Sequence, residues 1–264
     1  MGKQKRKSKA RGFFWWLIML IAVGVFSFSA YKLITIWLEY RQGTEEYNDL
    51  QGFVLSEAAT ATTSEDESTD EGVEAEDPGP KIDFEELKKV NQDIIGWLQV
   101  EDIPDINYPI VQGKDNDYYL HRTVKGTYNF AGSIFLEHTN KPDFSDPHSI
   151  IFGHNMKNGS MFGKLKNFGS GDFANAKHYF WVCTPDRNYK YEVFSVQEVI
   201  SGGEAYTLFS GPGPEVAEYI EKMKGQSSVT MPDIAFDENS KVVTLSTCTT
   251  NTIKRLIIQG ILVN

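Results

Sequence analysis

Residues 242–248 read VVTLSTC and residues 254–263 read KRLIIQGILV, two runs typical of β-strands with a short polar connection between them. Strand alternation in the first run gives one face Val243, Leu245 and Thr247 and the other face Thr244, Ser246 and Cys248. The cysteine therefore ends a strand on a semi-polar face. If the two strands are neighbours, Arg255 at the start of the second lies opposite the cysteine end of the first.

Shorter runs of β-type residues precede this pair, with Gly, Pro and Asn between them. They lie at residues 106–111, 132–136, 149–152, 179–183 and 189–199. A helix is predicted from Asp83 to Leu98, where apolar residues recur at helical spacing, and shorter helices at residues 117–121, 159–168 and 214–224. Many short strands with few helices predict a mainly β fold, either a closed barrel or a sandwich, with peripheral helices.

The N-terminal region has a pattern of its own. Basic residues precede an apolar stretch at residues 13–30, and apolar character resumes at residues 33–38. This length suffices for a membrane-spanning helix, and the basic residues before it predict a cytoplasmic N-terminus. Small residues near Ala30 leave a cleaved signal peptide as the alternative. The apolar continuation and the aromatic residues at both ends favour a retained anchor.

Between this segment and the predicted strands lies an acidic stretch. Residues 56–80 are rich in Ala, Thr, Ser, Glu and Asp and have almost no large apolar side chain, so they predict an extended tether, with an acidic docking tail as the other reading. The chain is thus divided into a basic cytoplasmic tail at residues 1–11, a transmembrane anchor at 12–38, an extracellular acidic linker at 39–81 and one folded domain at 82–264.

Composition excludes several classes of protein. The formal net charge is -10, but Lys and Arg in the folded domain are interspersed with Asp and Glu, which argues against a nucleic-acid-binding surface. The two cysteines, Cys183 and Cys248, are too few for a disulfide-dense scaffold or a Cys-rich zinc site. A single bridge between them stays open, although the apolar run around Cys183 is typical of a buried strand.

A nucleophilic cysteine needs a proton donor for its leaving group, and histidine is the usual one. His154 directly follows the apolar run 149–152, at a strand-to-loop transition where functional sites are commonly built. The pattern favours a catalytic pair of Cys248 and His154, with Arg255 as a cation that favours the thiolate. Two plainer readings stay open: a surface arginine, and a metal site at His148 and His154 that lacks clustered further ligands.

Several stretches resemble one known family. Residues 244–248, TLSTC, resemble the TLxTC signature of sortases, and Arg255 resembles the arginine that opens their next strand. The following stretches resemble class B sortases in the same order: residues 118–120 (YYL), 131–135 (AGSIF), 150–156 (IIFGHNM) and 160–162 (SMF). The resemblance covers most of residues 82–264.

This resemblance implies an eight-stranded sortase β-barrel with an N-terminal helix and peripheral helices. It implies a cysteine transpeptidase in which Cys248 attacks the Thr carbonyl of a C-terminal sorting signal and forms a thioester. His154 is then the proton shuttle and Arg255 the electrostatic partner. The implied partners are surface proteins that bear the signal and an amine of a peptidoglycan cross-bridge or its lipid-linked precursor, in a Gram-positive envelope. No cofactor, metal or calcium is implied.

The resemblance also reaches the substrate groove. Asn116, Tyr206 and Ser246 match groove positions of the class, with ordinary turn or loop residues as the plainer reading. The connection from Cys248 to Arg255 is shorter than in some class B members, which would alter the lip of the groove.

Three rival functions are a pilin-polymerising sortase, a plain extracellular cysteine protease and an inactive, membrane-tethered peptide-binding module. The first often carries a C-terminal membrane span, which this sequence does not show, and the inactive module is disfavoured because Cys, His and Arg are all present.

Overall fold

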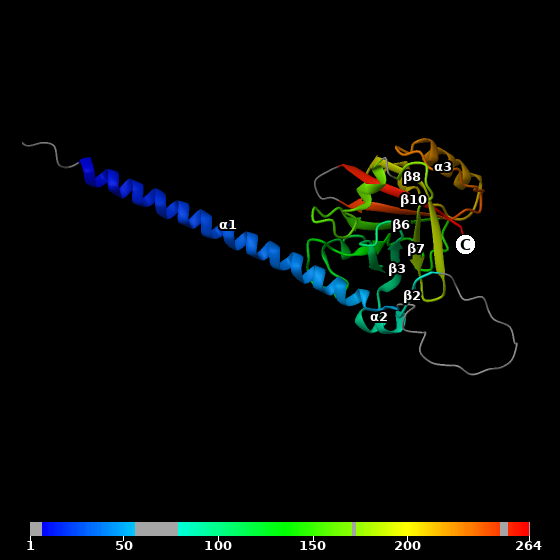
Figure 1. The fold of residues 1–264 in the computed structure, drawn as a ribbon, viewed down its shortest axis with the longest axis horizontal. Helices are drawn as coiled ribbons and strands as arrows, with labels where there is room; N and C mark the ends of the chain where they lie inside the picture. The colour runs from blue at the N-terminus through cyan, green and yellow to red at the C-terminus, as the bar shows by residue number, and fades with distance from the viewer. Residues whose placement is uncertain (1–6, 56–78, 171–172, 249–252, 264) are drawn as a thin grey trace, which may run out of the picture. The chain divides into compact units, whose positions relative to one another are not determined.

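The computed structural model of the protein describes residues 7–55, 79–170, 173–248 and 253–263. The chain divides into two compact units at Glu45. Helix α1 (Lys7–Gln51) makes up the described part of the first unit and continues into the second (Figure 1). Its stretch Gly12–Gln51 contains an 18-residue window with a mean hydropathy of 2.1, long and apolar enough to cross a membrane. A signal sequence can have the same length and hydropathy, so the retained anchor stays a prediction.

The second unit is built around a closed barrel of eight strands, in the spatial order β10-β8-β7-β3-β4-β5-β6-β9 (Figure 1). The strands are β3 (Ile94–Val100), β4 (Asn107–Val111), β5 (Ile134–Leu136), β6 (His148–His154), β7 (Tyr179–Cys183), β8 (Asn188–Ile200), β9 (Val242–Cys248) and β10 (Lys254–Leu262). Neighbours pair antiparallel except β4 with β5 and β6 with β9. The predicted eight-stranded barrel is confirmed, and Cys183 and Cys248 are not joined by a disulfide.

The peripheral helices are short. They are α2 (Phe84–Val90) and α3 (Pro214–Gly225), with 3₁₀ turns η2 (Tyr119–His121), η3 (Leu165–Gly169) and η5 (Glu204–Tyr206). Helix α3 turns four residues at helical spacing onto the barrel: Val216, Tyr219, Ile220 and Met223. They form one buried cluster with residues of three strands, Phe194 of β8, Val242 of β9, and Ile257 and Ile261 of β10.

The helix predicted from Asp83 to Leu98 is wrong in its second half. The Asp83 carboxylate accepts from Glu86 N at 3.0 Å and caps α2, which ends at Val90, and residues 94–100 form strand β3. The apolar residues whose spacing predicted a helix lie instead on a strand with buried residues on both faces. Gly96 was the residue in this stretch that argued against a helix. The structure explains the glycine, because a Cβ there would lie 2.8 Å from the Cys183 carbonyl of the neighbouring strand β7.

The end of α1 packs within the second unit. Tyr47 and Leu50 are buried, and the Tyr47 hydroxyl donates to the Gly132 carbonyl at 2.8 Å. Strand β1 (Val54–Leu55) then pairs with β2 (Lys81–Ile82). Part of the range predicted as a linker is therefore helix and strand, whereas residues 56–78 lie outside the described residues and their tether stays a prediction.

Removing the buried side chain at the end of α1 should destabilise the barrel. In a fragment of residues 46–264, Leu50→Ala should lower the free energy of unfolding by roughly 2–5 kcal/mol, because it leaves a cavity. Urea unfolding followed by tryptophan fluorescence measures the loss, and Asn48→Ala, at an exposed position of the same helix, is the control. Equal unfolding midpoints for the two variants would contradict this packing.

Candidate active site

Three neighbouring strands bring the predicted catalytic residues to one edge of the barrel. Strands β6 and β9 run parallel, and their register pairs His154 with Cys248. Strand β10 runs antiparallel to β9 and pairs Ile257 with Ser246, so the same register continued sets Arg255 opposite Cys248. Residues distant in the sequence thus meet at the ends of consecutive strands.

His154 is buried between two backbone carbonyls. Its Nε2 lies 2.8 Å from the Leu120 oxygen and its Nδ1 lies 3.2 Å from the Cys248 oxygen. Carbonyls only accept, so both contacts are satisfied only by an imidazolium. Burial nevertheless lowers the pKa of His154, and the neighbouring His121 and Arg255 act in the same direction. At neutral pH the ring is therefore uncharged, but the two carbonyls would accept hydrogen bonds from the imidazolium once it forms.

Cys248 also rests in its neutral form. Burial raises the pKa of its thiol to about 11, against the opposing effects of the Arg255 charge and a backbone hydrogen bond from Gly153. Arg255 thus acts on both members of the pair, since it lowers the pKa of the thiol and of His154. The resting site is a thiol beside a neutral imidazole.

Two of the three predicted groove residues lie together beside the cysteine. The hydroxyls of Tyr206 and Ser246 are 2.8 Å apart, and the Tyr206 ring is stacked parallel to Phe152 with centroids 6.4 Å apart. Burial raises the pKa of Tyr206, and the charges of Cys248 and Arg255 both act on it, which places this hydroxyl within electrostatic reach of the site.

The third predicted groove residue, Asn116, has its hydrogen bonds elsewhere. Its Nδ2 donates to the Glu137 carboxylate at 2.6 Å, and its Oδ1 accepts from His138 N at 3.0 Å. Glu137 N donates to the Ile150 carbonyl, so these partners lie several residues along β6 from His154. A groove role for Asn116 stays a prediction.

The alternative of a metal at two histidines fails on distance. His148 and His154 begin and end β6, which separates them by about 20 Å at the usual rise of a strand. Both ring nitrogens of His148 are hydrogen-bonded, to the Thr207 carbonyl and the Thr244 hydroxyl. In the described part of the chain, no group of three or more His, Cys, Asp or Glu side chains could hold a metal ion.

Sequence reasoning passed over one neighbour of the site. The His121 ring stacks on His154, with centroids 5.6 Å apart and planes 22° apart. Its Nδ1 is buried and has no hydrogen-bond partner among the described residues. His121 follows no strand, which is why it was not singled out, and the 3₁₀ turn that carries it also supplies the Leu120 carbonyl to His154.

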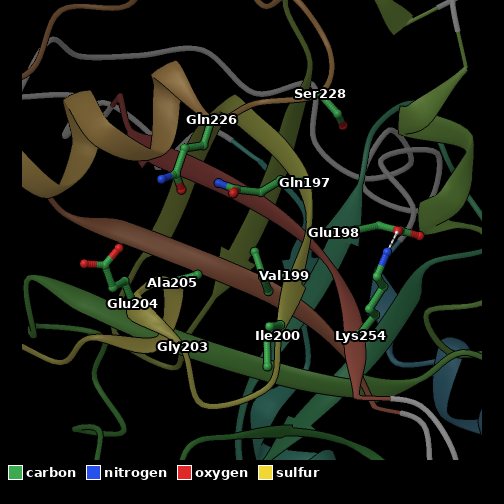
Figure 2. A pocket seen from close by; sticks show the side chains of 10 residues that line it. All are labelled: Gln197, Glu198, Val199, Ile200, Gly203, Glu204, Ala205, Gln226, Ser228 and Lys254. Atoms are coloured by element: carbon green, nitrogen blue, oxygen red, sulfur yellow. Dashed lines mark ion pairs between the residues drawn. The ribbon is translucent and has the colours of Figure 1, made fainter.

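A pocket of about 720 Å³ lies between the end of β8, η5 and the end of α3 (Figure 2). Ala205 and Lys254 line it, and they directly precede Tyr206 and Arg255 in the chain. An ion pair between Lys254 and Glu198 crosses one side of the pocket. The pocket therefore borders the segments that carry the site, and neither Cys248 nor His154 is among its described lining residues.

Comparisons with known proteins show which family the chain resembles. A model of the sortase domain matches residues 98–263. The chain is 34% identical to sortase B of Listeria monocytogenes over 259 residues, which is 97% of this chain and 99% of that protein. Its structure is similar to that of sortase B from Bacillus anthracis, with a TM-score of 0.68 and 31% identity, covering 86% of this chain and 99% of that one.

A second similar structure is that of a class B sortase of Streptococcus pyogenes involved in pilus biogenesis. It has a TM-score of 0.60 and 30% identity, and the match covers 68% of this chain and 97% of that one. The sortase domain spans well over half of this chain, and the relationship to sortase B extends over nearly its full length. The chain therefore belongs to the sortase family, among the class B cysteine transpeptidases.

Proposed function

We propose that this transpeptidase cleaves a C-terminal sorting signal after Thr and joins the surface protein to a peptidoglycan amine. The observation that carries the proposal is the meeting of Cys248, His154 and Arg255 at the ends of three consecutive strands. We further propose that α1 anchors the enzyme in the membrane of a Gram-positive cell. In this topology, the tail at residues 1–11 is cytoplasmic, residues 12–38 span the membrane, residues 39–81 link, and residues 82–264 form the extracellular catalytic domain.

The first half of the reaction forms the thioester. A proton passes from the Cys248 thiol to His154, and the thiolate adds to the Thr carbonyl of the signal. Arg255 stabilises the oxyanion that develops on the Thr oxygen. The imidazolium of His154 then donates its proton to the departing amine nitrogen as the peptide bond breaks.

The second half reverses these steps with a different nucleophile. The incoming amine attacks the thioester carbonyl, and neutral His154 accepts its proton. The C–S bond breaks, and the Cys248 thiolate recovers a proton from the imidazolium. One amide is exchanged for another, so no nucleotide is consumed, and water in place of the amine would give hydrolysis.

The reactive form of the pair is a minor one. A thiol with a pKa of about 11 is ionised to roughly one part in ten thousand at neutral pH. The two carbonyls at His154 hold the imidazolium once it forms, and Arg255 stabilises the thiolate beside it. The site therefore reacts through a small population in which both groups are charged.

The proposed proton distribution fixes the pH dependence of kcat/KM. Between the two pKa values, the gain in thiolate with rising pH is offset by the loss of imidazolium, so the rate should be flat from about pH 6.5 to about pH 10. Below the lowered pKa of His154, the imidazolium is complete and the thiolate falls about tenfold per pH unit. Stopped assays with a sorting-signal peptide measure the profile. A rate that keeps rising between pH 6.5 and 9 would contradict the paired mechanism.

Acyl-enzyme formation tests the nucleophile. Mass spectrometry of the chain with Asn-Pro-Gln-Thr-Asn-like and Pro-x-Thr-Gly-like peptides should show an adduct on Cys248 that an added amine converts to product. The Cys248→Ala variant should form none, and substantial turnover by it would refute the mechanism. Hydrolysis without an amine-linked product, even when amines are present, would favour the protease alternative.

The role of Arg255 is tested by a conservative change. Arg255→Lys keeps the charge but loses the planar donor fork, and kcat should fall roughly 100- to 1,000-fold, as expected when an oxyanion donor is lost. Lys254→Ala is the matched control, because Lys254 neighbours Arg255 in the chain, is exposed and pairs with Glu198 at the surface at 3.6 Å. Equal kcat values for the two variants would show that Arg255 has no role in the reaction.

Joining of pilin subunits is a second candidate function, because the similar Streptococcus pyogenes sortase is involved in pilus biogenesis. The acceptor distinguishes the two functions. A wall-anchoring enzyme resolves the thioester with a small peptidoglycan amine, whereas a polymerase requires a lysine of a folded subunit. Competition between the two acceptors in the same mass-spectrometric assay measures the preference.

A further inference from the structure

Four buried polar side chains form continuous hydrogen bonds between the barrel and α3. We call them the buried polar chain: His148 of β6, Thr244 of β9, Gln259 of β10 and Tyr219 of α3. His148 Nε2 lies 2.7 Å from Thr244 Oγ1. Gln259 Nε2 donates to Thr244 Oγ1 at 3.0 Å and to the Tyr219 hydroxyl at 2.7 Å.

The two ends of the buried polar chain form hydrogen bonds with the backbone carbonyls on either side of Tyr206. His148 Nδ1 lies 2.7 Å from the Thr207 oxygen, and the Tyr219 hydroxyl donates to the Ala205 oxygen at 2.8 Å. Ala205 and Tyr206 belong to η5, whose own backbone hydrogen bonds are local, such as Tyr206 N to the Gly203 carbonyl. The buried polar chain therefore ties this turn to β6 on one side of Tyr206 and to α3 on the other.

The direction of each bond follows from the two carbonyl ends. A carbonyl only accepts, so His148 Nδ1 carries the proton and Nε2 accepts from the Thr244 hydroxyl. The Thr244 oxygen accepts from one Gln259 amide hydrogen, and the other goes to the Tyr219 oxygen, whose own hydrogen is donated to Ala205. Every donor of the buried polar chain therefore has an acceptor when His148 is neutral. Burial favours this form, because it lowers the pKa of the ring to about 4.

We infer that the buried polar chain positions Tyr206 for substrate binding. It fixes the carbonyls of Ala205 and Thr207, and thereby holds the Tyr206 hydroxyl 2.8 Å from Ser246 Oγ, two residues before Cys248. Apolar packing under α3 buries Ala205 and part of Tyr206, but hydrogen bonds to defined carbonyls also fix the orientation of the turn. The inference rests on the proposed function, because it assigns positioning residues for binding of the sorting signal.

Single variants remove the two ends of the buried polar chain separately. Tyr219→Phe keeps the ring and removes the donor to Ala205. His148→Gln places its amide near the Nε2 position, where the oxygen still accepts from Thr244, and takes the donor away from the Nδ1 position beside the Thr207 carbonyl. In the full-length chain in detergent, each should raise KM for the sorting-signal peptide roughly 5- to 50-fold, the loss of about one buried hydrogen bond, with a smaller change in kcat. Protection of the buried Cys183 from alkylation measures the folded fraction of each variant.

The matched control is Tyr191→Phe. Tyr191 is as deeply buried as Tyr219, and its hydroxyl has no hydrogen-bond partner among the described residues. This variant should leave KM and kcat unchanged. A similar rise in KM in Tyr191→Phe would show a general effect of altering a buried tyrosine and would overturn the inference.

A double variant shows whether the effect passes through Tyr206. Adding Tyr219→Phe to Tyr206→Ala should cause no further rise in KM, because the side chain to be positioned is gone. Full additivity of the two changes would overturn the inference, as would an unchanged KM in both Tyr219→Phe and His148→Gln.

A spectroscopic readout separates this inference from the proposed function. In a chain labelled with 3-fluorotyrosine, the ¹⁹F resonance of Tyr206, assigned from Tyr206→Phe, should be single in the wild type and broadened or split in Tyr219→Phe but not in Tyr191→Phe. This result needs no turnover, so it holds even if no peptide is a substrate. An unchanged Tyr206 resonance in Tyr219→Phe would overturn the positioning role.

Discussion

The parallel pairing of β6 with β9 is the constraint on which the site depends. Its register runs without a break from His148 opposite Val242 to His154 opposite Cys248. A one-residue slip would turn each side chain to the other face and separate the imidazole from the thiol. Gly153 allows the close packing at this edge, because a Cβ there would lie 2.4 Å from the Ile134 side chain and 2.8 Å from Phe162.

Burial at this edge has two opposing effects on the chemistry. It raises the pKa of the thiol to about 11 and lowers that of His154, so both groups rest uncharged. The same low-dielectric surroundings strengthen the attraction between thiolate, imidazolium and the Arg255 guanidinium once charge develops. An enzyme of this design keeps a weakly reactive resting thiol and concentrates its electrostatic stabilisation on the charged states of the reaction.

Local sequence patterns were sufficient for the strands that carry the cysteine and the histidine. The alternation in residues 242–248 and the apolar run before His154 are properties of short segments, and both strands formed where they were predicted. Strand β3 was mistaken for a helix because Ile94 and Trp97 are spaced as in a helix, and burial of both faces removed the alternation that marks a strand. The partners of β6 depend on barrel closure between distant segments, and no local pattern contains that information.

The contacts of Tyr206 show a further limit of sequence reasoning. His148, Thr244 and Gln259 lie on three strands, and polar residues at strand positions would ordinarily be read as facing solvent. Here α3 covers them, and their desolvation is offset because each donor has an acceptor. An apolar replacement of the whole set would remove the donors to both carbonyls and would leave the buried Ala205 carbonyl unsatisfied, at a cost of about 1–3 kcal/mol. The polar residues under α3 are therefore explained by the turn that they hold in place. The position of that turn is itself explained by Cys248, because the turn carries Tyr206 beside it.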